Sequence, residues 1–371
     1  MKRVIVSVTN DLVTDQRVAK VCNSLIKNNF DVLLIGRKRS TSKPLVRKYP
    51  TKRFQLFFNS GFLFYAEYNL KLFFYLLFLR KDILVANDLD TLLPNYLVGK
   101  FQRKKIVFDS HELFSEVPEL VCRPHVKKIW TSLESWIIPN LKNKYTVCAS
   151  IANYYREKYD TNFETIKNLP NKKELIKGRF SFDTNDKKII LYQGAINVGR
   201  GLELLIEAMN FLEEHLLVII GDGDIYKDLT KRISSQKLNE KVLLLGPIAP
   251  KELQYLTPLA DLGISLEEDL GLNYRFALPN KIFDYIQGEV PILVSNLPEM
   301  KAVALRHKVG EVVQNRDPKH LSNQIIKILN KDFTKELKLA RETLVWEKQE
   351  AKLMQLYNCL LYTSPSPRDS S

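Results

Sequence analysis

The stretch DLGLNYRFALPNKIFDYIQGEVPILVSNLPEM, residues 269–300, places a polar loop, a short amphipathic helix and a buried strand in close succession. The pattern predicts a helix that begins after Pro279 and ends near Gly288, because proline is tolerated in the first turn of a helix. Residues 292–294 predict a buried strand, and Pro298 is expected in a second loop. A helix followed closely by an apolar strand is typical of α/β proteins.

The predicted helix also carries two charged residues that could serve a ligand. Lys281 lies in its first turn, where the N-terminus of a helix favours anions, and Asp284 lies three residues further on, on the same face. The helix therefore offers a cation for phosphate and a carboxylate for hydroxyl groups. An ordinary amphipathic helix, with Ile282, Phe283 and Ile286 packed inward, is the alternative.

The same alternation of strand and helix patterns extends along the whole chain of 371 residues, which is long enough for two domains. Short apolar runs at residues 4–8 and 83–86 predict strands in the first half, and runs at 189–192 and 216–220 predict strands in the second. The Lys-rich passage 168–188 has no period and is expected to link the domains. The predicted fold class is α/β, with parallel sheets and crossover helices.

The net charge of +14 is concentrated in the first half of the chain. Residues 1–180 carry 32 Lys and Arg against 16 Asp and Glu, and residues 181–371 carry 24 against 26. A positive surface suits nucleic acid or anionic lipid. Since the sequence has no zinc-finger spacing, RNP-like aromatic motif or basic repeat, nucleic acid is not expected as a partner. Four dispersed cysteines argue against a zinc site and a disulfide framework, and fit the cytoplasm.

Two neighbouring segments of the first half could meet a membrane. Residues 37–53 form a basic region that is expected to be a loop, and residues 62–79 are dense in Phe, Tyr and Leu. The second segment could be a buried helix, or a partly exposed apolar surface that touches anionic lipid beside the basic region. Its longest apolar run is too short to span a bilayer.

Polar clusters follow two of the predicted strands in the first half. Residues 87–90 (NDLD) follow one strand, and residues 109–112 (DSHE) follow another. Because ligands of open α/β sheets bind at the carboxyl ends of the strands, both clusters are expected to point into one crevice. His111 could act there as a base or as a hydrogen-bond donor, or could be a turn residue. No G-x-G-x-x-G follows the first strand, so a nicotinamide dinucleotide is not expected there.

Glycine-rich turns follow the predicted strands of the second half. Residues 193–201 (QGAINVGRG) hold three glycines and Arg200, which would suit close backbone approach to a phosphate with an arginine as its counter-charge. The alternative is a tight turn with an arginine in solvent. The turn at 221–224 (GDGD) opens another helix, and neither turn ends in the GKS/T of a P-loop.

Taken in order, these segments resemble the retaining glycosyltransferases of family 4, which have the GT-B architecture. In the second half the resemblance is carried by the Gly194 loop, IIGDGD at 219–224, LLLGPI at 243–248, LADLGISL at 259–266 and PNKIFDYIQGEVPILVS at 279–295. In the first half it is carried by TNDLVTDQRVAKV, VANDLDTLLP and FDSHELFSEVPEL. It covers about residues 2–361 and is specific as an ordered set.

The resemblance implies two Rossmann-like, doubly wound domains that face a cleft. Residues 1–170 would form an acceptor-binding domain and residues 171–345 a nucleotide-sugar-binding domain. Residues 346–361 would be a helix that packs back on the first domain, and residues 362–371 a disordered or non-native tail.

The family's site residues can be carried over position by position. Arg200 matches the family's basic residue for the donor diphosphate, Asp284 matches its carboxylate for the ribose hydroxyls, and His111 matches its cleft histidine. A second basic residue of the family falls on Ala195 and a further glutamate on Phe276, so Asn280 and Lys281 are expected to take the place of that glutamate. The expected catalytic residues are His111, Arg200 and Lys281; the expected donor-binding residues are Gly194, Gly199, Gly201, Gly221, Asp222, Gly223, Asn280 and Asp284; and the expected acceptor-side residues are Asp15, Arg17, Asp88, Asp90 and Glu112.

The resemblance further implies transfer of a hexosyl sugar, with retention, from a UDP or GDP sugar to a lipid-linked or polysaccharide hydroxyl. This would be a bacterial cell-surface glycan reaction that needs no metal and no cofactor. The enzyme would be cytoplasmic and attached peripherally, through its basic first domain, to the inner face of the plasma membrane. A nucleotide-sugar epimerase of the same architecture and a basic membrane-binding module are the alternatives.

Overall fold

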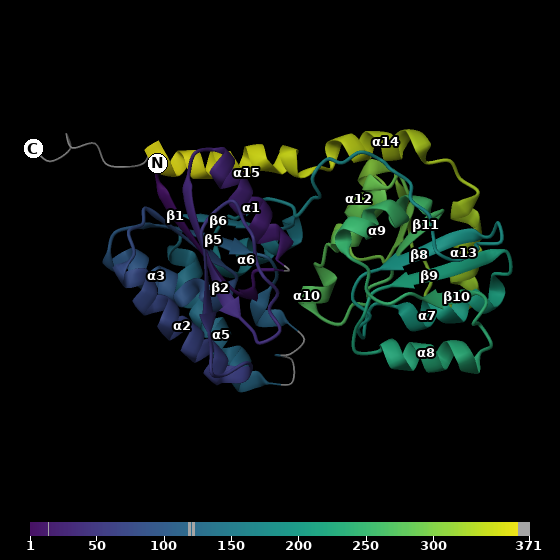
Figure 1. Ribbon diagram of the computed structural model, residues 1–371, viewed down its shortest axis with the longest axis horizontal. Helices are drawn as coiled ribbons and strands as arrows, with labels where there is room; N and C mark the ends of the chain where they lie inside the picture. The colour runs from purple at the N-terminus through teal and green to yellow at the C-terminus, as the bar shows by residue number, and fades with distance from the viewer. Residues whose placement is uncertain (14, 118–119, 121–122, 363–371) are drawn as a thin grey trace, which may run out of the picture. The chain divides into compact units, whose positions relative to one another are not determined.

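The computed structural model describes residues 1–362, except 14, 118–119, 121–122 and the side chains of 361 and 362. The contacts within the chain define two compact domains (Figure 1). The first domain comprises Met1–Asn168 together with the residues from Gln349 onward, and the second comprises Leu169–Lys348. Apart from Tyr362, the tail expected at 362–371 lies outside the described residues.

The described residues of the first domain form a seven-stranded sheet in the order β3-β2-β1-β4-β5-β6-β7. All its neighbouring strands are parallel. The strands are β1 (Arg3–Asp11), β2 (Asp31–Lys38), β3 (Thr51–Gln55), β4 (Ile83–Asn87), β5 (Lys105–Ser110), β6 (Asn143–Thr146) and β7 (Glu164–Thr165).

Helices connect these strands and lie on both faces of the sheet (Figure 1). Those described are α1 (Gln16–Lys27), α2 (Gly61–Phe78), α3 (Leu92–Phe101), α5 (Pro124–Ile137), α6 (Ala149–Tyr159) and α15 (Trp346–Tyr362). Helix α15 packs against α1, because the rings of Phe30 and Tyr357 meet edge to face at 5.9 Å and Lys27 Nζ lies 3.0 Å from Glu350 Oε2.

Helix α2 is apolar on both its inner and its outer faces. Phe64, Tyr68, Leu72 and Leu76 recur at a spacing of four residues and are buried, the last three against the sheet. The other faces carry phenylalanines and leucines that are exposed to solvent: Phe62, Leu63, Leu70, Phe74 and Phe78. One face of this helix is therefore buried and the others expose apolar side chains, whereas contact of these side chains with a membrane stays a prediction.

The second domain repeats the same architecture with a six-stranded sheet in the order β10-β9-β8-β11-β12-β13 among its described residues. Its neighbouring strands are also all parallel. The strands are β8 (Lys188–Gln193), β9 (His215–Ile220), β10 (Val242–Leu244), β11 (Leu262–Ser265), β12 (Ile292–Val294) and β13 (Gly310–Val312).

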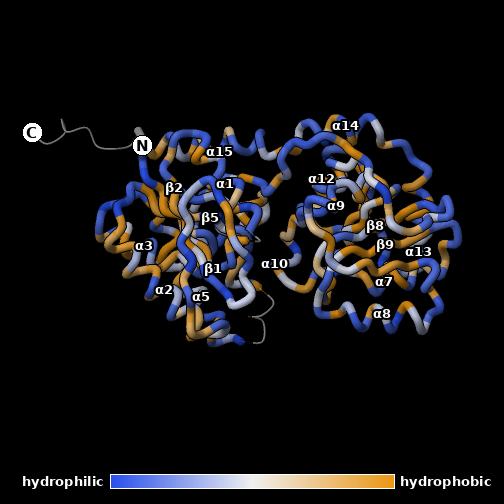
Figure 2. Tube along the Cα trace, in the orientation of Figure 1, coloured by the Kyte–Doolittle hydropathy of each residue, from blue (hydrophilic) through white to orange (hydrophobic). Residues whose placement is uncertain are grey.

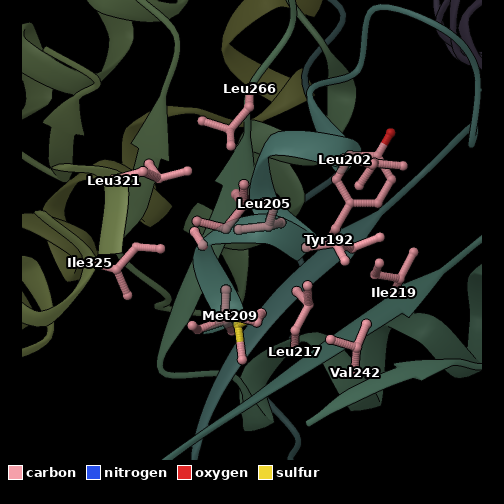
Figure 3. Close-up of a cluster of buried hydrophobic side chains, with 14 of the residues drawn as sticks. Tyr192, Leu202, Leu205, Met209, Leu217, Ile219, Val242, Leu266, Leu321 and Ile325 are labelled. Carbon is pink, nitrogen blue, oxygen red and sulfur yellow. The ribbon is translucent and has the colours of Figure 1, made fainter. Parts of the chain in front are cut away.

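Two layers of helices cover the two faces of this sheet. They are α7 (Leu202–Ala208), α8 (Tyr226–Ser235), α9 (Pro250–Leu256), α10 (Leu272–Arg275), α11 (Asn280–Gln287), α12 (Pro298–His307), α13 (Pro318–Leu329) and α14 (Thr334–Thr343). Along β8, Ile190 and Tyr192 join the core under α7 and α13, where Figure 3 shows Tyr192 near Leu202 and Leu205. Ile189 and Leu191 join the core under α11 and α12. In Figure 2 the strands β8 and β9 are largely hydrophobic and α8 is largely hydrophilic.

A buried tyrosine joins α11 to the two central strands of this sheet. The Tyr285 hydroxyl accepts a hydrogen bond from the Gln193 amide at 3.1 Å and lies 3.1 and 3.2 Å from the carbonyl oxygens of Leu191 and Ile264. Gly263 leaves room for this contact, because a Cβ there would lie 2.4 Å from the Tyr285 ring. The helix predicted from residues 269–300 is thus fixed at the ends of β8 and β11.

The α/β class and the helix after Pro279 are confirmed, but some local predictions are wrong. Pro298 begins helix α12 rather than lying in a loop, because proline needs no intrahelical partner in a first turn. The basic region 37–53 contains the end of β2 and the start of β3, whose sequence TKRFQ is charged because it forms the edge of the sheet. Within the described ranges, no helix is long and apolar enough to cross a membrane.

Candidate functional site

Each sheet has one point where the strand order changes direction along the chain. In the first sheet this point lies between β1 and β4, and in the second it lies between β8 and β11. Crossover connections leave on opposite sides there, so the carboxyl ends of the two strands border an open crevice in which ligands of α/β proteins bind. The candidate residues of each domain gather at this point and are described domain by domain.

A buried carboxylate organises the crevice of the second domain. Glu267 follows β11, and its side chain is fully buried. Its Oε1 lies 2.8 Å from Lys281 Nζ and 3.6 Å from the Arg200 guanidinium, and its Oε2 accepts a hydrogen bond from Ser265 Oγ at 2.6 Å. Burial disfavours the charged carboxylate, but Lys281 and Ser265 outweigh this effect and lower the pKa of Glu267 below its usual value.

The two cations that the sequence singled out therefore meet at one anion. Lys281 Nζ lies 3.9 Å above the centre of the Tyr192 ring, and the Arg200 guanidinium lies 5.5 Å from that of Tyr274. Only 8% of the Lys281 side chain is exposed, against 27% of that of Arg200. The group carries a net charge of one plus, which suits an anionic ligand. Glu267 was not among the predicted site residues, although its place after an apolar strand is a signal that could have found it.

Asp284 lies on the exposed side of α11, one turn after Lys281. Its Oδ2 accepts a hydrogen bond from Gln193 Nε2 at 3.4 Å, and Gln193 Oε1 accepts one from Thr257 Oγ1 at 2.8 Å. Asn280 is the exposed first residue of the same helix. Phe276, where an acidic residue would match the resemblance, is half-buried at the end of α10. Glu267 and Asp284 thus supply the carboxylates of this site, and the position at which the resemblance has a glutamate is occupied by Phe276.

The glycines of the second domain allow neighbouring loops to pack backbone against backbone. Gly221 has φ +151°, and a Cβ on it would lie 1.8 Å from the Gly194 carbonyl oxygen. Gly201, at φ +70°, would place a Cβ 2.3 Å from the Leu266 carbonyl oxygen. These positions, with Gly199 and Gly223, bring the three loops after β8, β9 and β11 together. Asp222 is exposed and accepts a hydrogen bond from the Gly223 amide.

In the first domain the charge pattern is reversed, because carboxylates surround a histidine. His111 Nδ1 lies 3.3 Å from Asp88 Oδ2, and its Nε2 lies 3.1 Å from Asp109 Oδ2. Asp109 is fully buried and also binds the Arg17 guanidinium at 2.8 and 3.2 Å. Arg17 donates a further hydrogen bond to the Ile166 carbonyl. Arg17, predicted on the acceptor side, therefore lies inside this network and supports His111 through Asp109.

The network changes the protonation of its members. Burial favours a neutral His111, but Asp88 and Asp109 outweigh it and raise the pKa of His111 to about 9. Burial raises the pKa of Asp109, yet Arg17 and His111 outweigh burial and lower that pKa to about 2. At neutral pH His111 is therefore a cation, suited to hold an anionic or hydroxyl group and unsuited to accept a proton.

The other predicted acceptor-side residues lie at the same edge. Burial, reinforced by the charge of Asp88, raises the pKa of Asp90 to about 8, and Thr9 Oγ1 donates a hydrogen bond to this carboxyl group. Asp88 has φ +59°, a left-handed conformation that is uncommon for a non-glycine residue and recurs at functional sites. Asp15 caps α1 by accepting a hydrogen bond from the Val18 amide. Together with Glu112, these residues line a cavity of about 1150 Å³.

We expect the imidazole of His111 to titrate near pH 9 instead of near its usual 6.5. A raised pKa in the folded state means that this interaction stabilises the fold fully below about pH 6.5, and that the contribution is lost as the pH rises through about 9. NMR titration of the imidazole, assigned with His111→Gln, measures the pKa. Asp88→Asn should lower it, because it removes one of the two flanking charges. A pKa near 6.5 in the native chain would contradict this arrangement.

We expect Glu267→Gln to destabilise the fold by about 3–5 kcal/mol, because it leaves the Lys281 ammonium buried without its counter-charge. The double variant Glu267→Gln/Lys281→Met should recover most of that loss. The matched control is Glu268→Gln, whose half-exposed ion pair with Arg316 should contribute no more than about 1 kcal/mol. Urea unfolding measures the free energy of unfolding of all three variants. Equal losses in Glu267→Gln and Glu268→Gln would show that the buried ion pair stabilises the domain no more than the half-exposed one.

Comparison with known proteins finds a family model that matches the second domain and solved structures that share the fold of both domains. Residues 176–343 match the family model of glycosyl transferases group 1. No curated protein matches the sequence significantly. Sucrose-phosphate synthase from Thermosynechococcus elongatus superposes with a TM-score of 0.77 at 16% identity, covering 98% of this chain and 100% of that one.

Two further solved structures are similar over their whole length. A glycosyltransferase from Rickettsia africae has a TM-score of 0.73 at 16% identity, covering 98% of this chain and 99% of its own. HepE from Anabaena, in complex with UDP, has a TM-score of 0.72 at 13% identity, covering 97% of this chain and 100% of its own, and another structure of HepE contains UDP-glucose. The chain therefore has the GT-B fold of two Rossmann-like domains that its sequence predicted, and its second domain matches the glycosyl transferases group 1 family.

Proposed function

We propose that this protein transfers a sugar from a nucleotide-diphosphate sugar to an acceptor hydroxyl group. The observation that carries the proposal is the meeting of Arg200 and Lys281 at the buried Glu267, in the crevice of a domain that matches glycosyl transferases group 1. The complexes of the similar HepE with UDP and UDP-glucose favour a UDP sugar as the donor.

In this proposal the second domain holds the donor by complementary charge. Arg200 and Lys281 bind the diphosphate, with Glu267 keeping both side chains in place before the donor arrives. Asp284, held by Gln193, accepts hydrogen bonds from the ribose hydroxyls. Preorganised cations stabilise the negative charge that develops on the departing diphosphate, which is a large contribution to catalysis of this kind. They can do so without a metal ion, as the resemblance to family 4 suggests.

The reaction breaks the bond between the anomeric carbon and the diphosphate oxygen and forms a bond from that carbon to the acceptor oxygen. With retention of configuration, the acceptor attacks from the face on which the diphosphate leaves, so the departing phosphate oxygen is the nearest base for the hydroxyl proton. The cationic His111 fits this scheme as a hydrogen-bond donor rather than as a base.

We propose a hexosyl donor and an acceptor in cell-surface glycan synthesis, bound by the first domain at the cytoplasmic face of the membrane. The cationic and hydrogen-bonding groups at the end of β4 and β5 would orient the acceptor hydroxyl. Peripheral attachment is supported by the exposed phenylalanines of α2 and by the basic residues that precede this helix.

We expect Arg200→Ala to lower kcat/KM for the donor by about 100-fold or more while leaving the midpoint of thermal unfolding nearly unchanged, because Arg200 is partly exposed and its ion pair is long. The control is Arg232→Ala, which removes a surface arginine of α8 that pairs with Glu207. Lys281→Ala should also abolish transfer.

Screening of nucleotide diphosphates by thermal shift, followed by transfer assays with the matching sugar, provides the measurements. Wild-type turnover in Arg200→Ala and in Lys281→Ala would reject the assignment. Consumption of the donor sugar without any acceptor would instead indicate the epimerase.

We expect sedimentation with anionic vesicles at low salt and release at high salt, because basic residues attract the lipid surface within a short screening distance. Phe74→Glu and Phe78→Glu should weaken attachment, since both side chains are exposed on α2 and that of Phe78 is 84% exposed. Phe211→Glu, at an exposed position in the second domain, is the control. Attachment that persists in high salt would refute the electrostatic part of the proposal.

A further inference from the structure

The cavity of the first domain is apolar over most of its length and polar at one end. Its apolar lining comes from α2, α3 and α5, with Leu70, Leu97, Ile129 and Trp136 among the residues that are also exposed to solvent. Its polar lining comes from the strand ends that carry Asp88, Asp90 and His111. At about 1150 Å³ it exceeds the ~300–1,000 Å³ of common small-molecule sites.

A buried arginine lines the same cavity without a counter-charge. Arg37 lies at the carboxyl end of β2, beside the end of β1, and is only 8% exposed. Its guanidinium lies 4.5 Å from the centre of the Phe64 ring, and one weak hydrogen bond of 3.4 Å reaches the Asn59 carbonyl. Across the described ranges Arg37 forms no ion pair, and its buried Nε has no hydrogen-bond partner. A buried charge left unpaired is costly, so this site would gain by binding an anion.

We propose that the cavity binds the acceptor as a lipid, with a hydrocarbon chain between α2, α3 and α5 and a phosphate headgroup on Arg37. This inference rests on the proposed glycosyltransferase function and names the class of its acceptor. A hydrocarbon chain suits the apolar walls, which would leave the many hydroxyl groups of a glycan without hydrogen-bond partners. Arg37 then holds the lipid headgroup within the same cavity that His111 lines.

The charges at the polar end are compatible with a phosphate. His111 is cationic and lies beside Asp88, and burial raises the pKa of Asp88 to about 7 and that of Asp90 to about 8, so neither carboxyl group is fully ionised at neutral pH. Asp15 also lines the cavity, but its carboxylate accepts the capping hydrogen bond of α1. Glu112 also lines the cavity, and Arg37 supplies a cation that forms no ion pair with the described residues. The solvent-exposed apolar side chains of the walls provide an entry for a hydrocarbon chain.

Two tryptophans in the cavity wall, Trp130 and Trp136, make binding measurable by fluorescence. We would titrate the full-length protein, without nucleotide, with farnesyl phosphate, with farnesol, which has the chain alone, and with inorganic phosphate. We expect saturable binding of farnesyl phosphate that is at least about tenfold tighter than that of farnesol, because only the phosphate can form charge-assisted hydrogen bonds with Arg37. Inorganic phosphate should not displace the lipid at similar concentrations.

Two pairs of variants test the two ends of the site. Arg37→Met should weaken farnesyl phosphate by at least about tenfold and leave farnesol unchanged, whereas Arg39→Met, which removes the same charge from an exposed neighbouring position, should have no more than a twofold effect. Leu97→Asp should weaken both prenyl compounds by placing a charge in the apolar wall. Phe101→Asp, one turn further along α3 and outside the cavity, should not.

Three results would overturn the proposal: no saturable binding of farnesyl phosphate, equal losses in Arg37→Met and Arg39→Met, or displacement of farnesyl phosphate by equimolar inorganic phosphate. The last result would indicate a site that binds phosphate without any contribution from the hydrocarbon chain of the lipid. If farnesyl phosphate does not bind while a nucleotide diphosphate still raises the midpoint of thermal unfolding, the lipid acceptor is rejected and the transferase function stands. If farnesyl phosphate binds while no nucleotide diphosphate raises the midpoint of thermal unfolding, the lipid-phosphate site stands, but the transferase function and the role of the lipid as its acceptor are rejected.

Discussion

The second domain depends on a negative charge that is fully removed from water. Glu267 remains ionised in the interior because Lys281 and Ser265 outweigh the cost of burial, and the guanidinium of Arg200 approaches it from a third segment. Those segments are the helix α11, the loop after β8 and the end of β11 itself. The burial of one carboxylate therefore holds these three parts of the chain together, and the group that it forms with Lys281 and Arg200 carries one excess positive charge.

The corresponding position in the first domain has the reverse arrangement of charges, with carboxylates around a cation instead of cations around a carboxylate. At the point where its strand order reverses, a histidine cation lies between Asp88 and Asp109, and Arg17 supports the deeper carboxylate. Both domains share the parallel sheet and the crevice that follows from it, yet they present different electrostatic surfaces there. We propose a diphosphate as the ligand of the second domain, and an acceptor with a single phosphate at Arg37 as the ligand of the first. The common fold thus leaves the choice of ligand to side chains.

The sequence was sufficient to predict what depends on local pattern. The alternation of apolar strands and amphipathic helices identified the α/β class, and the resemblance carried by an ordered set of motifs predicted the GT-B fold of two Rossmann-like domains. It missed β3, because an edge strand keeps few apolar residues, and it missed α12, because Pro298 begins a helix as readily as it marks a loop. It singled out Arg200 and Lys281 but not Glu267 or Arg37. The place of Glu267 after an apolar strand was a local signal, but its burial against Lys281, like the burial of Arg37, depends on residues distant in the sequence.

The Tyr285 hydroxyl has a consequence for the thermodynamics of binding. It ties α11 to the backbone of β8 and β11, so the helix that carries Lys281 and Asp284 is already ordered before any ligand arrives. A ligand in this crevice then has little backbone motion to freeze, and the loss of conformational entropy on association is small. The affinity of the second domain for a ligand would consequently depend on the direct contacts that the ligand makes. The favourable enthalpy of these contacts would be reduced only slightly by an entropy cost of ordering the protein.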